Sequence, residues 1–138
     1  MNKGIEIKIA GSGPLEKASQ KYYVGKISQT DLPTYYSAAN VVIVPSTHDE
    51  GFGRVILESL ACGTPVIGSN RGAIPEAMDN SVGKLIDITP VKIKDTIEYF
   101  YENPDKLKDL SNNTRAFAEK RYSSNNLIAI LSCYSSME

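Results

Sequence analysis

The sequence predicts an α/β domain in which helices cover both faces of a parallel β-sheet. Short apolar segments alternate with helical segments as far as residue 90, and such alternation implies right-handed crossovers between parallel strands. The segment 41–45 (VVIVP) is a continuous β-branched run, as expected for a parallel strand that is covered on both faces. The length of 138 residues fits one domain with a single core, so we expect residues 1–138 to form one unit.

Five segments have the composition of strands. Segment 5–10 (IEIKIA) alternates apolar and charged residues and ends at a GSGP turn. Segment 22–27 (YYVGKI) is a short strand candidate, and segment 65–69 (PVIGS) repeats the β-branched character of 41–45. Segment 84–88 (KLIDI) is a weaker pattern, which favours a position at the edge of the sheet.

Helices are predicted between these strands and after them. Ser28 and Asp31 have the spacing of a capping box before LPTYYSAAN, and Pro33 falls in the first turn, where its missing N–H costs nothing. Residues 54–62 form the next predicted helix, which ends at Gly63, a residue suited to a left-handed cap. After residue 90 we expect three amphipathic helices, which are IKDTIEYFYEN, residues 105–121 and NNLIAILSCY.

Charge and composition exclude several functional classes. With 15 Lys+Arg against 16 Asp+Glu, the chain has no basic field for holding nucleic acid. Cys62 and Cys133 are too far apart in sequence to suggest a disulfide framework or a C-x-x-C site, and His48 alone cannot build a His-rich metal centre. No apolar run approaches the roughly 18 residues of a membrane-spanning helix, and the segment MNKGIEIK lacks a signal-peptide core. We therefore expect a soluble cytoplasmic protein.

The loop 46–54 (STHDEGFGR) is the first candidate site, because ligands of parallel sheets bind beyond the carboxyl ends of the strands. Gly51 and Gly53 flank Phe52 just before a helix, whose start presents unpaired N–H groups with partial positive charge. This predicts an anion site suited to a phosphate, with the Glu50 carboxylate placed to accept hydrogen bonds from hydroxyl groups. A tight turn followed by a favourable acid at a helix start fits the same spacing, so the residues alone leave both interpretations open.

Glu58 is the second candidate. Apart from Glu58 and Ser59, residues 55–62 are apolar or small, and a helix that is apolar nearly all round is normally buried. A buried carboxylate is costly unless it is paired, so Glu58 needs a partner, and the hydroxyls of a ligand would qualify. The alternative is that Glu58 reaches solvent or a basic side chain.

Glu50 and Glu58 stand in EGFGRVILE, an E-x7-E arrangement that is followed by SLACGTPVIGSNRGAIPEAM. This stretch closely resembles the signature of retaining nucleotide-sugar glycosyltransferases of family 4, which have the GT-B fold. The likeness continues in IAGSGP, VGKISQTDLPTYYSAANVVIVPS, SVGKLID and RYSSNNLIAIL, so it covers nearly the whole chain. It implies a Rossmann-like domain, the carboxy-terminal half of a GT-B enzyme, that binds a nucleotide-diphosphate sugar.

The resemblance also implies a role for each motif residue. Glu50 would bind hydroxyls of the donor sugar and is the catalytic candidate. The amides of Gly51, Phe52 and Gly53 would contact the sugar and the diphosphate at the helix start. Glu58 would accept hydrogen bonds from the two ribose hydroxyls.

Two further segments would complete the donor site. The backbone around Lys26 and Ile27 would edge the nucleobase, and Gly11 to Gly13 would line the same cleft. In the family the anomeric configuration is retained, and the leaving diphosphate is stabilised electrostatically rather than by a metal. The resemblance therefore implies no metal and no cofactor besides the nucleotide-sugar substrate.

The chain departs from the family by lacking two parts. One is a strand–loop–helix unit with an Arg and a Lys that clamp the diphosphate, and the other is the amino-terminal domain that binds the acceptor. In a sheet of order 3-2-1-4-5-6 the missing strand is central, so IEIKIA would flank an empty slot beside VVIVP. We expect part of a longer enzyme with little turnover of its own, and membrane contact only through the absent parts. The unpaired sheet edges offer a surface for self-association, and the sequence leaves the oligomeric state open.

Two other functions compete with this interpretation. A Rossmann dinucleotide binder would use AGSGPLEK, but Glu16 occupies the place of the third glycine in G-x-G-x-x-G. A catalytically inactive nucleotide-binding fragment or interaction module would keep the fold without turnover. The intact Glu50, Gly51, Gly53 and Glu58 argue against long decay, but not against loss of activity by truncation.

Overall fold

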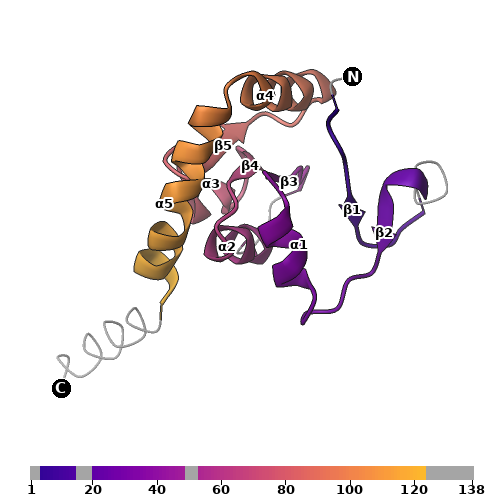
Figure 1. Ribbon diagram of the computed structural model, residues 1–138, viewed down its shortest axis with the longest axis horizontal. Helices are drawn as coiled ribbons and strands as arrows, with labels where there is room; N and C mark the ends of the chain where they lie inside the picture. The colour runs from indigo at the N-terminus through magenta and orange to yellow at the C-terminus, as the bar shows by residue number, and fades with distance from the viewer. Residues whose placement is uncertain (1–3, 15–19, 49–52, 124–138) are drawn as a thin grey trace.

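The computed structural model describes residues 4–14, 20–48 and 53–123. Strands and helices alternate through most of this part of the chain (Figure 1). The elements in chain order are β1 (Ile9–Ala10), β2 (Tyr23–Gly25), α1 (Leu32–Ala38), β3 (Val42–Val44), α2 (Arg54–Ala61), β4 (Val66–Ser69), α3 (Ile74–Ala77), β5 (Gly83–Ile86), α4 (Pro90–Glu102) and α5 (Pro104–Tyr122).

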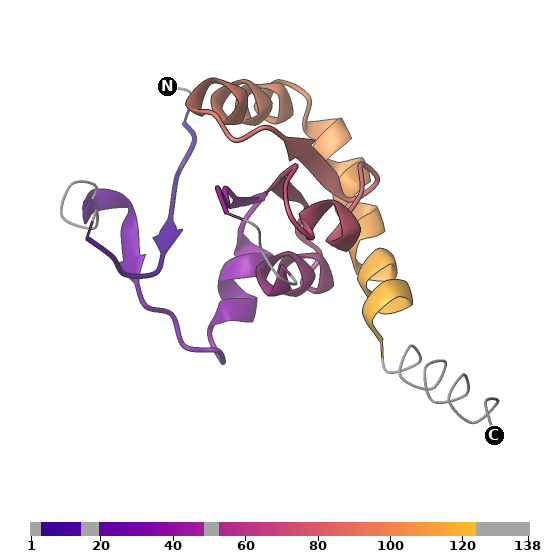
Figure 2. The same ribbon diagram turned by 180° about the vertical axis from the view of Figure 1, so that it is seen from behind.

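All strand pairs in these segments are parallel, which confirms the predicted α/β class. β1 pairs with β2 in one sheet, and β3, β4 and β5 form a second sheet in that order. β5 therefore lies at an edge, as its weak pattern predicts. Figures 1 and 2 show the β1–β2 pair on the opposite side of the larger sheet from α5. The sequence expectation that IEIKIA does not pair with VVIVP agrees with this division into two sheets.

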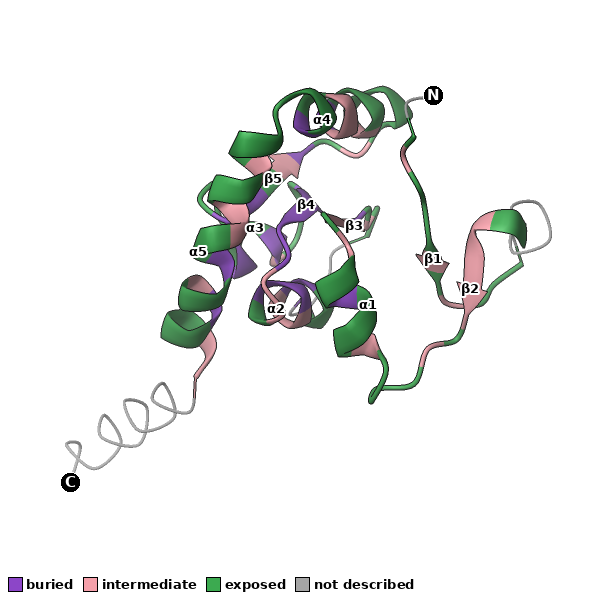
Figure 3. Cartoon of the chain, in the orientation of Figure 1, coloured by how far each residue is buried: buried purple, intermediate pink, exposed green. Residues whose placement is uncertain are grey.

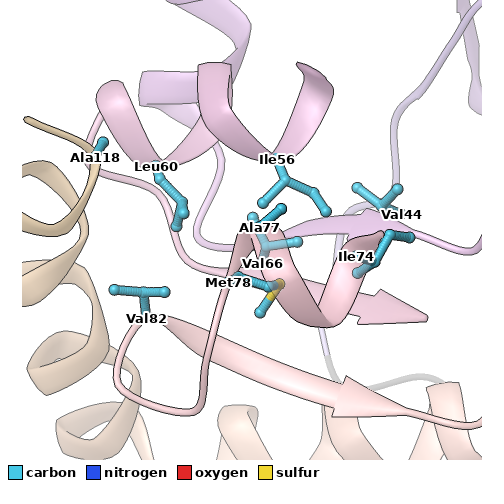
Figure 4. Close-up of a cluster of buried hydrophobic side chains, with 9 residues drawn as sticks. All are labelled: Val44, Ile56, Leu60, Val66, Ile74, Ala77, Met78, Val82 and Ala118. Atoms are coloured by element: carbon cyan, nitrogen blue, oxygen red, sulfur yellow. The ribbon is translucent and has the colours of Figure 1, made fainter. Parts of the chain in front are cut away.

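The central strand β4 explains why its sequence is continuously apolar. Val66 and Ile67 are adjacent, so their side chains point to opposite faces of the sheet, yet both are fully buried. Val66 belongs to a cluster with side chains from β3, α2, α3 and α5 (Figure 4). Ile67 belongs to a second cluster with Ile86 and Phe100, which brings α4 onto the other face. Helices thus cover both faces, as predicted.

The helices follow the predicted start and stop signals closely. α2 begins at Arg54 and reaches its C-cap at Cys62, and Gly63 then takes a φ of +87° as the left-handed cap prediction requires. The Ser28 hydroxyl accepts a hydrogen bond from the Asp31 N–H at 3.2 Å, but the regular helix begins only at Leu32. None of the helices in the described segments is long and apolar enough to cross a membrane.

Three features differ from the sequence expectations. α2 is not covered all round: Val55 is 44% exposed, while other residues of the helix pack against α1, α5, β3 and β4 (Figure 3). α3 was not predicted, since its four residues are too few to show a helical period. Val42 and Ile43 of β3 are half-buried rather than buried, because no strand in the described part of the chain pairs with one edge of β3. The predicted helix NNLIAILSCY lies outside the described residues.

Candidate functional site

A cavity lies at the carboxyl ends of the larger sheet, the edge at which parallel sheets bind ligands. Its volume is about 310 Å³. Its lining comes from the segments that follow β3, β4 and β5, and consists of Ser46, Thr47, Asn70, Arg71, Asp87 and Ile88. The Arg71 Nη1 donates a hydrogen bond to the Thr47 carbonyl oxygen at 2.9 Å, which ties the loop after β3 to the loop after β4. The fold thus makes a polar hollow where the sequence places its site loops.

The start of α2 adjoins the loop after β3 in the chain and requires glycine at Gly53. This residue is buried and has a φ of +65° and a ψ of +43°, in the left-handed region. A Cβ atom here would lie 3.2 Å from Cδ1 of Ile56 and 3.6 Å from Cβ of Ala77. No side chain caps this helix start within the described part of the chain. A left-handed glycine at this helix start fits both the tight turn and the anion site, so the phosphate-site role of Gly53 stays a prediction.

The other residues predicted for this loop cannot be placed. Glu50, Gly51 and Phe52 lie outside the described residues. Their assigned contacts with the sugar and the diphosphate therefore stay predictions. Of the E-x7-E pair, the structure describes Glu58.

Glu58 has partners within the chain. The Tyr36 hydroxyl donates to its Oε2 atom at 2.9 Å, and the Arg54 Nε lies 3.1 Å from its Oε1 atom. The Glu58 side chain remains 33% exposed, while that of Arg54 is 71% exposed. The carboxylate is paired, but it is not buried as expected: it reaches solvent and contacts a basic side chain, as the alternative interpretation held.

Tyr36 is held firmly where it meets Glu58. It lies on α1, which packs against α2, and its exposed fraction is 8%. The buried Thr64 hydroxyl donates to the Tyr36 carbonyl oxygen at 2.6 Å, and the Thr64 carbonyl in turn accepts from the Ser59 hydroxyl at 2.9 Å. Burial, together with the hydrogen bond to Glu58, raises the pKa of Tyr36 to about 12. The phenol therefore stays protonated, and remains a donor, at neutral pH.

Sequence reasoning did not single out Tyr36. One signal in the sequence could have pointed to it: Glu58 was predicted to be a buried carboxylate, and no hydrogen-bond donor within the chain had been named for it. Tyr36 is the second tyrosine of LPTYYSAAN, on the helix before β3. It meets Glu58 only through the packing of α1 against α2, which joins residues 22 positions apart.

The remaining predicted residues gather at the β1–β2 pair. The Gly11 N–H donates to the Gly25 carbonyl oxygen at 2.9 Å, so Gly11 lies beside the backbone that leads into Lys26 and Ile27. Gly13 is exposed, and a Cβ atom at this position would meet no atom within 4 Å. These residues form one group at the carboxyl ends of β1 and β2. Gly53 and Glu58 form another at α2, which packs against β3 and β4 of the larger sheet, whereas β1 and β2 form the smaller sheet.

The sequence is similar to one protein family and to several known proteins. The family described as glycosyl transferases group 1 matches residues 4–117. A D-inositol 3-phosphate glycosyltransferase of Gordonia bronchialis is 36% identical over 106 residues, which are 75% of this chain and 23% of that protein. An O-antigen chain mannosyltransferase B of Escherichia coli is 42% identical over 59 residues, 43% of this chain and 15% of its own length.

Solved structures match nearly all of the chain. Sucrose-phosphate synthase of Thermosynechococcus elongatus superposes with a TM-score of 0.79 and 27% identity, over 96% of this chain and 38% of that one. HepE of Anabaena in complex with UDP gives a TM-score of 0.79 at 22% identity, over 96% of this chain and 41% of its own. The chain thus spans about two-fifths of the solved structures and less than a quarter of the sequence relatives named above.

Proposed function

Because this chain belongs to the glycosyl transferases group 1 family and has the fold of the carboxy-terminal half of a GT-B enzyme, we propose that it binds the nucleotide-diphosphate sugar donor. The observation that carries the proposal is the arrangement of α2. Gly53 starts this helix in a conformation that suits close backbone approach, and Glu58 presents a partly exposed carboxylate further along the same helix.

The spacing of these two features suits a nucleoside diphosphate. Glu58 comes five positions after Gly53, which corresponds to roughly 7.5 Å along the axis at about 1.5 Å per residue. A phosphate at the helix start would gain from the unpaired N–H groups and the helix dipole. The ribose attached to it would then come within reach of the carboxylate, which accepts hydrogen bonds from neighbouring hydroxyls. HepE was crystallised with UDP and with UDP-glucose, which agrees with a donor of this class.

The reaction proposed for the whole enzyme is transfer of a sugar to an acceptor with retention of configuration. Glu50 would bind the sugar hydroxyls, and the amides of Gly51, Phe52 and Gly53 would lie against the sugar and the diphosphate. Positioned N–H donors stabilise the charge that develops on the leaving diphosphate. The relatives include a glycosyltransferase acting on D-inositol 3-phosphate and a mannosyltransferase, which supports hexosyl transfer. The acceptor would bind to an amino-terminal domain, so this chain alone would turn over little substrate.

Calorimetric titration with UDP, GDP and NAD tests donor binding. We expect weak binding of UDP or GDP, no binding of NAD, and a clear loss of nucleotide affinity in Glu58→Gln. The matched control is Glu119→Gln, because Glu119 on α5 pairs with Arg115 in the same i,i+4 arrangement and at the same 3.1 Å as Arg54 and Glu58. Binding of NAD alone would support the dinucleotide alternative, and binding of none of the three would support the inactive-module alternative. Rapid sugar transfer by the chain alone would overturn the donor-half assignment.

A further inference from the structure

The contact between Tyr36 and Glu58 joins two helices that are distant in sequence. The Tyr36 hydroxyl, on α1, lies 2.9 Å from Oε2 of Glu58, on α2. Tyr36 is buried, yet its neighbour Tyr35 on the same helix is 43% exposed and has no such contact among the hydrogen bonds of the described residues. A phenol that is buried with its hydroxyl directed at a partly exposed carboxylate fixes the direction of that carboxylate.

The two oxygens of Glu58 have different donors. Oε2 accepts a hydrogen bond from the Tyr36 hydroxyl, and Oε1 lies 3.1 Å from the Arg54 Nε in an ion pair. An ionised carboxylate offers about four lone-pair positions, two on each oxygen. The Tyr36 hydroxyl takes one position on Oε2 and the Arg54 ion pair lies against Oε1, which leaves acceptor positions on both oxygens for a ligand. A pair of adjacent hydroxyls, as on a ribose, matches two neighbouring acceptors of this kind.

The two donors differ in how firmly they are held. The Arg54 side chain is mostly exposed and sits on the same helix as Glu58, an arrangement that contributes little and is easily rearranged. Tyr36 is buried, and its backbone carbonyl is anchored by the buried Thr64 hydroxyl at 2.6 Å. A ligand can therefore displace Arg54 from the carboxylate, but it cannot readily displace Tyr36.

We propose that Tyr36 is a positioning residue, which holds the Glu58 carboxylate in the orientation that accepts both hydroxyls of the ribose of a nucleoside diphosphate. This inference rests on the proposed function, since it assigns a partner to the same site. Tyr36 itself touches no ligand in this account. It acts through Glu58, and its effect should depend on the presence of the ribose hydroxyls.

A ligand comparison tests this dependence. The affinity of wild type and Tyr36→Phe is measured for whichever of UDP and GDP binds, and for the 2′,3′-dideoxy form of the same nucleotide. We expect Tyr36→Phe to weaken binding of the normal nucleotide about tenfold, the scale of one hydrogen bond to a charged group. Binding of the dideoxy nucleotide should hardly change. Tyr35→Phe, which removes the exposed hydroxyl next to it, should leave both affinities unchanged.

The outcomes separate the two proposals. If wild type binds neither UDP nor GDP, the proposed function fails and the role of Tyr36 fails with it. If wild type binds but Tyr36→Phe weakens both forms equally, or neither, the positioning role is refuted and the proposed function stands.

A measurement on the wild-type protein covers the case in which Tyr36→Phe does not fold. NMR can follow the Tyr36 hydroxyl proton and the Arg54 Nε–H as nucleotide is added. We expect the Tyr36 signal to persist and the Arg54 signal to shift. Loss of the Tyr36 hydroxyl signal on nucleotide binding would overturn the proposal.

Discussion

Replacing Gly53 with alanine should destabilise the protein, because two separate costs fall on this position. The φ of +65° and ψ of +43° lie in the left-handed region, where a residue with a Cβ loses about 1–2 kcal/mol. The new Cβ would also lie 3.2 Å from Cδ1 of Ile56, a side chain that is itself fully buried and can yield little. Together these predict a loss of about 1–3 kcal/mol in the free energy of unfolding.

Urea-induced unfolding followed by circular dichroism measures this loss. Gly13→Ala is the matched control, since Gly13 has no positive φ and a Cβ there meets no atom within 4 Å, so its unfolding midpoint should stay near that of wild type. Gly53→Asn should fall between Gly53→Ala and wild type, because asparagine tolerates the left-handed region better than alanine does. A Gly53→Ala protein as stable as wild type would refute the argument that this helix start depends on glycine.

Three further predictions concern the core and the buried phenol. Gly83→Ala should cost more than Gly53→Ala in a urea titration, because its Cβ would overlap the Val66 carbonyl oxygen of the paired strand; an unchanged midpoint would contradict this register. Phe100→Ala should lower the free energy of unfolding by about 3–5 kcal/mol, since Phe100 fills the cluster around Ile67 between α4 and the sheet, and a loss well under that range would mean that α4 packs elsewhere. The pKa of Tyr36 is raised from 10.0 to about 12, so the folded state keeps its proton after the unfolded state has lost it. The contribution of Tyr36 to stability is therefore constant below pH 10 and falls as the pH rises to about 12, and unfolding midpoints of wild type and Tyr36→Phe that run parallel across this window would contradict it.

The sequence predicted strands and helix ends well wherever a local signal decided them. The β-branched runs at β3 and β4, the glycine at Gly63 and the proline at the start of α1 each act within a few residues. α3 was missed because four residues cannot show a period. The incomplete burial of α2 was also missed, since composition does not reveal how much of a helix its neighbours cover.

The site shows the same division between local and long-range causes. A glycine at the start of α2 followed from residue chemistry, whereas Glu58 is partly exposed and has Tyr36 and Arg54 as partners, instead of being the buried acid that the sequence indicated. The partner Tyr36 could not be predicted, because α1 and α2 meet only through packing that joins residues 22 positions apart. How the β1–β2 pair is placed relative to α2 is also a long-range property. The two sheets share no strand in the described residues, so no local pattern could predict their arrangement.

The proposed donor site requires that one nucleotide binds to both the β1–β2 pair and α2. Backbone NMR spectra recorded during a titration with UDP or GDP test it most directly. We predict that the amide signals of Gly11, Lys26, Gly53 and Glu58 shift together and saturate at the same nucleotide concentration. Shifts confined to α4 and α5, with these four signals unmoved at saturation, would contradict the claim.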